Sequence, residues 1–159
     1  MAVLEASRFI EANDENRRAA ASLISAPEFL HAPLEVIEPR FCGRYEDGNG
    51  NAWIDPHPLR FSAQGAVNMP YLSDGMWFLT QFRRWGLLRE EPDYLAVASA
   101  VQQTALYAEA AAVLGLAVPA PMRSSCLFDG KVWDGSDPAA YARSFDLHAQ
   151  TDVRLAGEG

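Results

Sequence analysis

The sequence predicts a mainly α-helical protein with one short β-hairpin, and three observations support this fold class. Helix start and stop signals recur along most of the 159 residues. Residues 128–135 place an Asp-Gly turn between apolar positions, which is typical of a tight hairpin. Buried strands do not alternate with helices, as a parallel sheet would require. The expected order is three helices, a long loop, three helices, the hairpin and a last helix.

The N-terminal part is expected to form three helices. Residues 2–12 make the first, which begins at Met1 without a capping residue, as a helix that continues from upstream would. Asp14 is a suitable N-cap for the second, which should end at Ile24. A short third helix over residues 34–38 is entered and closed by prolines.

Residues 40–69 have the composition of a loop. Asp47 opens a run of Asp, Asn and Gly residues that invites comparison with a calcium-binding loop. Counted from Asp47, the sixth position is Ala52 where such a loop needs glycine, and the twelfth is Pro58 where it needs glutamate. We therefore expect a surface turn and no calcium site.

The most apolar helix is expected over residues 75–85, with Ser73 or Asp74 as its N-cap and Gly86 after its end. Its three-residue spacing predicts a buried stripe. The members of this stripe are Met76, Leu79, Phe82 and Trp85, and Trp77 and Phe78 widen it. An aromatic ligand site is the alternative for this surface. Arg83 and Arg84 are expected to be solvated, with anion binding as their alternative role.

Three further helices each follow a residue that can cap their first turn. Asp93 precedes residues 94–103, Thr104 precedes residues 105–114, and Asp137 precedes a last helix over residues 138–145. Beyond these helices the composition indicates a frayed end. We expect one folded region over residues 1–148 and a flexible tail over residues 149–159.

The charge balance argues against nucleic acid as a partner. The net charge is −8, from 21 acidic and 13 basic residues, and no Lys/Arg cluster is present. The sequence also lacks an apolar run long enough to span a bilayer. The N-terminal residues resemble an amphipathic helix and not a secretory signal.

The sequence offers no convincing catalytic, metal or cofactor centre. His31, His57 and His148 are far apart and have no partner at metal-ligand spacing. Cys42 and Cys126 are too few for a disulfide framework, so we expect free, partly buried thiols, with one disulfide as the alternative. Ser124, Ser125 and Cys126 form a nucleophilic run without a recognisable base in sequence; we expect a polar loop there, although His148 could lie near it in space.

Residues 68–86, NMPYLSDGMWFLTQFRRWG, resemble the C-terminal region of nitrate-binding proteins, the solute receptors of nitrate and bicarbonate ABC transporters. The resemblance extends over roughly residues 2–148. The other matching segments are residues 11–18, 25–33 and 43–50 upstream, and residues 122–125 and 129–142 downstream.

This resemblance implies the C-terminal portion of an α/β type II periplasmic-binding-protein fold, in which two lobes clamp an anion. The Trp, Gln, His and Lys groups of the family's anion pocket belong to segments upstream of this sequence. No ligand-binding residue is therefore assigned, and His31, His57 and Trp85 fall outside the family's pocket motifs.

The resemblance further implies part of a nitrate or nitrite receptor that passes its anion to an ABC transporter permease. Such a receptor is periplasmic, although a chain expressed as given, without a signal peptide, would stay in the cytoplasm. A cytosolic nitrate sensor of the same fold, which regulates by binding a partner protein, is the alternative. An enzyme similar to thiamine-pyrimidine synthases comes last, because their histidine- and cysteine-rich active site has no counterpart here.

One prediction concerns the chain expressed alone. The apolar faces of residues 2–12 and 75–85 would lack the sheet that such a segment normally packs on, and an exposed apolar patch of several hundred Å² favours association. We expect a helical chain that self-associates or is weakly stable. Light scattering coupled to gel filtration, together with a thermal melt, tests this; a monodisperse monomer that melts cooperatively would contradict it.

Overall fold

A computed structural model describes residues 1–128 and 130–145, and the chain divides into two compact units. The first unit comprises Met1–Asn68 and Glu109–Val118. The second comprises Met69–Ala108 and the described residues from Pro119 onward. The predicted turn residue Asp129, His148 and the predicted tail lie outside the described residues.

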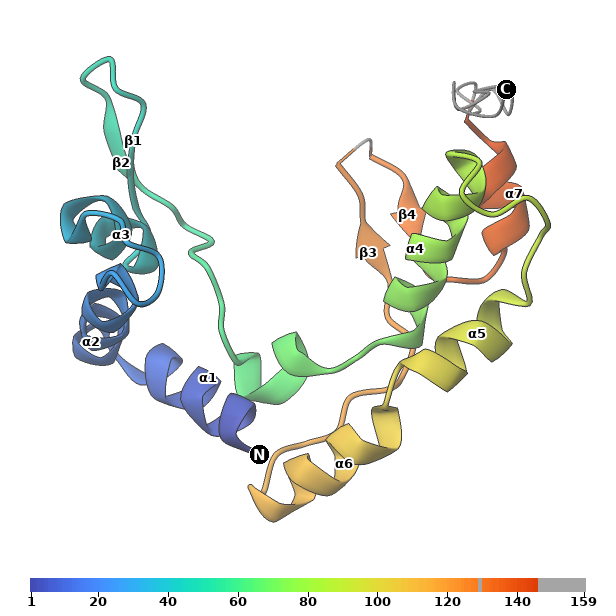
Figure 1. The fold of residues 1–159 in the computed structure, drawn as a ribbon, viewed down its shortest axis with the longest axis horizontal. Coiled ribbons are helices and arrows are strands. Elements are labelled where there is room, and N and C mark those ends of the chain that lie inside the picture. The colour runs from blue at the N-terminus through green and yellow to red at the C-terminus, as the bar shows by residue number, and fades with distance from the viewer. Residues whose placement is uncertain (129, 146–159) are drawn as a thin grey trace, which may run out of the picture. The chain divides into compact units, whose positions relative to one another are not determined.

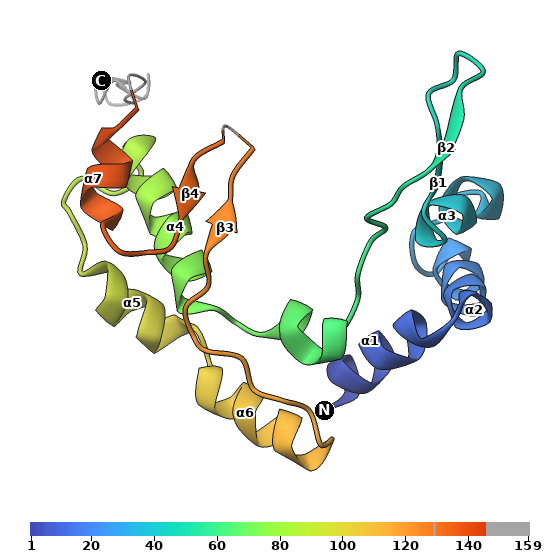
Figure 2. The same ribbon diagram turned by 180° about the vertical axis from the view of Figure 1, so that it is seen from behind.

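The described residues are mainly helical, with two short antiparallel hairpins (Figures 1 and 2). The predicted fold class is thereby confirmed, and a second hairpin is added to it. The helices are α1 (Ala2–Ala12), α2 (Asp14–Ser25), α3 (Leu34–Phe41), the short 3₁₀ element η1 (Ala63–Asn68), α4 (Leu72–Arg84), α5 (Tyr94–Val101), α6 (Thr104–Val113) and α7 (Pro138–Arg143). The strands are β1 (Arg44–Glu46), β2 (Ala52–Ile54), β3 (Ser125–Cys126) and β4 (Val132–Trp133). No helix among the described residues has both the length and the apolar character needed to cross a membrane.

The boundary between α1 and α2 differs by one residue from the prediction. Asn13, and not Asp14, is the N-cap of α2: its backbone is extended, and its side-chain oxygen accepts a hydrogen bond from the backbone N–H of Asn16 at 2.8 Å. Asp14 is instead the first residue of the helix, where its negative charge interacts favourably with the partial positive charge at the N-terminal end of the helix dipole.

Helix α3 continues past the proline at which we expected it to end. Pro39 lies inside the helix, which runs to Phe41. Proline removes the hydrogen bond that its own N–H would have donated and crowds the carbonyl four residues earlier, but the helix continues for two more residues. The backbone N–H of Cys42 then donates to the carbonyls of Glu38 and Pro39, which closes the last turn.

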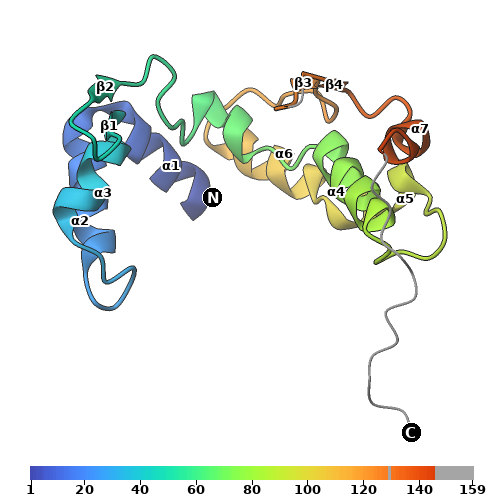
Figure 3. The ribbon, with the colours of Figure 1, turned by 90° about the horizontal axis from the view of Figure 1, so that it is seen from above.

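The predicted loop over residues 40–69 contains the hairpin of β1 and β2, which lies against α3 (Figure 3). The carboxylate of Asp47 organises its turn. It accepts hydrogen bonds from the backbone N–H of Asn49 at 2.8 Å and from the side chain of Asn51 at 2.7 Å. These bonds, the one from the Asn51 side chain above all, lower the pKa of Asp47. The carboxylate is thus engaged within its own turn, which confirms the expected surface turn.

The second unit is built around one buried cluster. Met76, Tyr94, Ala98 and Trp133 form it, and they come from α4, α5 and β4. The indole N–H of Trp133 donates to the carbonyl of Ser73 at 2.8 Å, which joins the hairpin of β3 and β4 to α4. Helix α7 packs on the same helix, α4 (Figure 1).

Neither residue predicted to cap α4 does so. The helix begins at Leu72 without a side-chain cap. The hydroxyl of Ser73 is buried and accepts from the backbone N–H of Arg123 at 3.1 Å. The carboxylate of Asp74 pairs with the guanidinium of Arg123 at 2.7 Å. Both residues therefore lie inside the first turn of the helix, and their side chains make tertiary contacts instead of capping it.

The predicted buried stripe on α4 is correct only at its N-terminal end. Met76 is buried and Leu79 is half-buried, but 39% of Phe82 and 55% of Trp85 are exposed. The buried residues of this helix include the polar Ser73, Thr80 and Gln81. Spacing indicates which face is apolar, whereas neighbouring elements decide which face is covered.

The remaining predicted helices are present, with bounds that differ by one or two residues. Thr104, which was predicted to cap α6, is instead the first residue of that helix. Asp93 caps α5 through the backbone N–H of Ala96, and Asp137 caps α7 through that of Ala140. Helix α5 ends at Val101 and α7 at Arg143, two residues earlier than expected in each case. The hairpin of β3 and β4 begins at Ser125, before the predicted start.

A glycine pair provides a test of the first unit. Gly43 and Gly48 have nearly the same positive φ, +71° and +74°. An alanine Cβ at Gly43 would lie 2.8 Å from the Cβ of Pro58, whereas at Gly48 it would meet nothing within 4 Å. We expect Gly48→Ala to lower the free energy of unfolding by about 1 kcal/mol through backbone strain. Gly43→Ala should cost about 1–3 kcal/mol more, because the proline ring cannot yield. Urea denaturation followed by circular dichroism measures both, and equal costs would contradict the predicted crowding.

Candidate functional site

The histidines do not form a metal or catalytic centre among the described residues. His31 and His57 are exposed on separate loops of the first unit, and His148 lies outside the described residues. No group of three or more His, Cys, Asp or Glu side chains that could hold a metal is found in residues 1–128 and 130–145.

The two cysteines are free, as expected. Cys42 is half-buried at the end of α3, but Cys126 is exposed, so the predicted partial burial holds for only one of them. The nucleophilic run does not form the expected loop throughout, because Ser125 and Cys126 make up strand β3. Its proximity to His148 stays open, since that residue is outside the described part of the chain.

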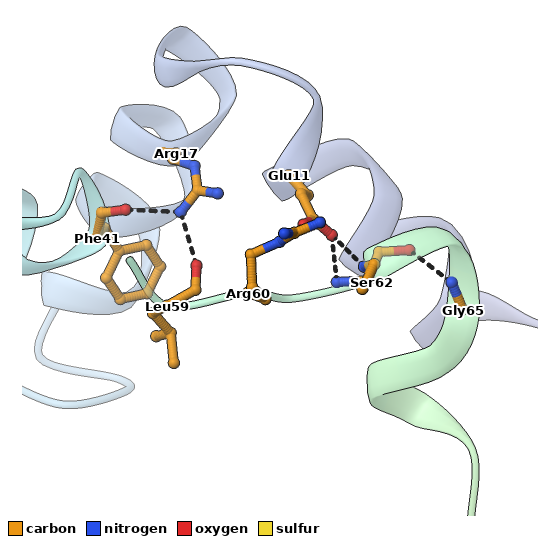
Figure 4. Close-up of polar contacts among 8 residues, drawn as sticks. Glu11, Arg17, Phe41, Leu59, Arg60, Ser62 and Gly65 are labelled. Carbon is orange, nitrogen blue, oxygen red and sulfur yellow. Dashed lines mark hydrogen bonds and ion pairs between the residues drawn. The ribbon is translucent and has the colours of Figure 1, made fainter. Parts of the chain in front are cut away.

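The first unit contains a polar cluster centred on Glu11, at the C-terminal end of α1 (Figure 4). Its carboxylate accepts hydrogen bonds from the backbone N–H groups of Ser62 and Ala63, and it pairs with the guanidinium of Arg60. These partners are 49 to 52 residues away in sequence. One carboxylate thus fixes the segment that enters η1.

The backbone that Glu11 holds is strained. Ala63 and Gln64 have positive φ angles of +43° and +57°, a conformation that costs a non-glycine residue about 1–2 kcal/mol. The backbone N–H of Gly65 donates a hydrogen bond to the hydroxyl oxygen of Ser62 at 3.2 Å, and this bond supports the same turn. Charge-assisted hydrogen bonds to Glu11 offset this strain.

Arg17 of α2 forms the second half of this cluster. Only 8% of the residue is exposed, and its guanidinium donates to the carbonyls of Phe41 at 2.8 Å and Leu59 at 3.1 Å. It also lies 5.4 Å from the centre of the Phe61 ring. The guanidinium therefore joins α2 to the end of α3 and to the segment before η1. All these contacts are internal, which indicates a structural role.

The environment of Glu11 shifts its ionisation. Burial by itself would raise the pKa of this carboxyl, but the hydrogen bonds from Arg60, Ala63 and Ser62 outweigh burial and lower the pKa below its ordinary value of 4.5. The folded chain therefore favours the ionised form of Glu11. This stabilisation is fully present above pH 4.5 and is lost as the pH falls through the lowered pKa.

The second unit contains an aromatic recess of about 470 Å³ between α4, the hairpin turn and the end of α7. Its lining comprises Trp77, Gln81, Arg84, Leu127, Phe128, Tyr141 and Phe145. Trp77 donates its indole N–H to the hydroxyl of Tyr141 at 3.2 Å, which fixes one wall. The guanidinium of Arg84 lies 3.8 Å from the centre of the Phe145 ring.

Two expectations from the sequence meet in this recess. Trp77 belongs to the helix surface for which an aromatic ligand site is the alternative, and Arg84 is one of the two arginines for which anion binding is the alternative. Both line this recess. Gln81, which is 97% buried, lies between them and was missed. The spacing 77, 81 and 84 is one helix face and could have indicated it. Aromatic faces beside a guanidinium can hold a flat apolar group, but they do not form a complete anion site.

Comparison with known proteins identifies relatives that share most of this chain. No family model matches the sequence. The nitrate/nitrite binding protein NrtA of Synechocystis is 33% identical over 156 residues, which cover 92% of this chain and 34% of the relative. The bicarbonate-binding protein CmpA of Synechococcus elongatus is 29% identical over 160 residues, or 92% of this chain and 35% of the relative.

Two further matches are informative. The nitrate import ATP-binding protein NrtC of Synechocystis is 27% identical over 96% of this chain, and the match covers 23% of that relative. Among solved structures, the periplasmic nitrate-binding protein NrtA from Synechocystis matches with a TM-score of 0.80 and 32% identity. That match covers 90% of this chain and 38% of the solved chain. This chain therefore spans between 23% and 38% of these relatives, and the predicted resemblance is confirmed.

The Glu11 cluster generates a prediction about stability. We expect Glu11→Gln to lower the free energy of unfolding by about 1–3 kcal/mol at pH 7, because an amide cannot accept all the donors that surround the carboxylate. The difference from the unsubstituted chain should shrink as the pH falls below 4.5, where the carboxyl itself takes up a proton. Urea denaturation at pH 7 and pH 3 measures both effects.

A matched control is Glu109→Gln, at an exposed position in the middle of α6. Its effect should stay within about 0.5 kcal/mol. If the Glu11 variant is no less stable than this control at pH 7, the Glu11 cluster does not hold the strained turn.

Proposed function

We propose that this chain is the C-terminal region of an anion receptor for an ABC transporter. The match to the nitrate/nitrite- and bicarbonate-binding proteins covers about one third of the length of each. The observation that carries the proposal is the structural match to the periplasmic nitrate-binding protein, with a TM-score of 0.80 at 32% identity over 90% of this chain. The proposal covers residues 1–148. The receptor would act in the periplasm and deliver its ligand to the transporter's permease.

The ligand that we propose is nitrate or nitrite. Identity to the nitrate/nitrite binding proteins of Synechocystis and Nostoc is 33% and 29%, and identity to the bicarbonate-binding protein is 29%. The choice of nitrate therefore follows the resemblance over residues 68–86. The net charge of −8 does not oppose anion uptake, because neutral hydrogen-bond donors and one lysine can bind a small anion locally. We place the residues that contact the anion in the part of the receptor that this chain does not span. The described residues would then support the lobe and would not touch the ligand.

A second candidate follows from the matches to ATP-binding proteins. The nitrate import and bicarbonate transport ATP-binding proteins match over 96% of this chain, at 27% and 28% identity. The chain would then be the receptor-like region of a transporter's ATP-binding component. In that case, an anion bound to the receptor-like region would regulate a partner protein. A cytosolic nitrate sensor, the alternative function predicted from the sequence, would act in the same way. A receptor and such a region differ in whether the complete polypeptide binds ATP.

The proposed function predicts that this chain can replace the matching segment of a related receptor. In a hybrid of the Synechocystis nitrate/nitrite binding protein that carries residues 1–148 in place of its own segment, we expect nitrate binding and restored growth on nitrate in a receptor-deficient strain. Calorimetry on the purified hybrid and growth curves measure these outcomes. The 159-residue chain alone should give no binding heat with nitrate.

Two controls make this test decisive. The same segment placed in the bicarbonate-binding protein should leave the preference of that hybrid for bicarbonate unchanged, because the proposal places the anion contacts outside this chain. A folded nitrate hybrid that neither binds nitrate nor restores growth would contradict the proposed function. Tight nitrate binding by the chain alone would show instead that the pocket lies within these residues.

A further inference from the structure

An apolar groove of about 210 Å³ runs between α4 and α5 in the second unit. Its walls are large side chains, Phe78 and Phe82 from α4 and Val97 and Val101 from α5. None of the residues that line it is charged. The groove lies outside the aromatic recess, and nothing in the polar cluster of the first unit contributes to it.

Small residues create the groove. Gly75 of α4 faces Ala98 of α5, and a Cβ built at Gly75 would lie 3.3 Å from the Cβ of Ala98. It would also lie 3.0 Å from the side-chain nitrogen of Gln102. The two helices therefore approach closely at this end. The larger side chains on either side rise above this floor and leave a hollow between them.

The walls of the groove are exposed to an unusual degree for apolar residues. The exposed fractions are 55% for Phe78, 39% for Phe82, 38% for Val97 and 67% for Val101. Covering an apolar surface contributes about 25 cal/mol per Å². A continuous exposed apolar surface of this kind usually marks a contact with another protein segment.

The dimensions and chemistry of the groove favour apolar side chains as its occupants. A cavity of about 150 Å³ holds a benzene molecule, so a groove of about 210 Å³ accommodates one aromatic or two aliphatic side chains. Gln102 provides the single polar side chain in the lining. A charged ligand would therefore lose its hydration without gaining a charged partner.

The extent of the structural match indicates where such an occupant comes from. The similar nitrate-binding protein contains this fold as 38% of its chain, at a TM-score of 0.80, so most of that protein is available to cover the groove. We propose that the groove between α4 and α5 is the docking surface for an apolar segment from the part of the receptor that this chain does not span. This inference rests on the proposed function, and it specifies which face of the chain meets the rest of the receptor.

Two valines provide matched variants for the test. Val101 and Val113 are each the last residue of a helix and each 67% exposed, but only Val101 lines the groove. A carboxylate introduced at either position meets the same end of a helix dipole. Any difference between Val101→Asp and Val113→Asp in binding therefore reports on the groove and not on helix stability.

The experiment mixes this chain with the upstream part of the Synechocystis nitrate/nitrite binding protein, produced as a separate polypeptide, and measures assembly by light scattering and affinity by titration. We expect a one-to-one complex that replaces any self-association of this chain. Val101→Asp should weaken it by roughly 100-fold, because a buried carboxylate has no charged partner in the groove. Val113→Asp should leave the affinity within about threefold.

Three results would overturn the inference. The first is no complex, and the second is a complex that both valine variants leave unchanged. The third is a discrete dimer of this chain that Val101→Asp dissociates and the upstream polypeptide does not displace, which would make a second copy the occupant. Failure of the proposed function is read separately: a complex sensitive to Val101→Asp that binds no nitrate supports the groove and contradicts the ligand.

Discussion

Helices that have no sheet to pack on must cover their apolar faces with one another, and both units of this chain are shaped by that requirement. In the second unit, α4 is covered by α5, α7 and the hairpin of β3 and β4, yet Phe82 and Trp85 stay largely exposed. The largest fully buried side chains among the described residues are those of the polar Thr80 and Ser73. Apolar packing within the described residues is therefore incomplete, and specific polar contacts fix the positions of the elements.

Those polar contacts join segments that are distant in sequence. Glu11 and Arg17 hold the segment that leads into η1 against α1 and α2, while the indole of Trp133 and the guanidinium of Arg123 attach the C-terminal part to the start of α4. Hydrogen bonds are directional and sensitive to geometry, unlike apolar contacts. They can therefore maintain a defined arrangement in each unit although large apolar surfaces remain open.

The exposed apolar surfaces of this chain are consistent with its match to only part of longer relatives. A segment that makes up about a third of its relatives, with an uncharged groove on one face, has the properties expected of a part of a larger fold. The aromatic recess beside Arg84 and the groove beside Phe78 lie on different parts of α4. One helix thus presents two surfaces of different chemistry, and only the recess offers a charged group.

The sequence by itself determined the helical class, the hairpin before α7, the caps at Asp93 and Asp137, and the resemblance to nitrate-binding proteins, because local spacing and short-range hydrogen bonds decide these features. Only the tertiary structure decided that the side chains of Ser73 and Asp74 contact Arg123 instead of capping α4. It alone also decided that Leu127, Tyr141 and Phe145 close a recess over the face of α4 that carries Gln81. The tertiary structure also decided that the apolar stripe on α4 is buried at Met76 but exposed at Phe82 and Trp85. These outcomes depend on partners tens of residues away, and no local pattern records which polar group will lie within 3 Å of another.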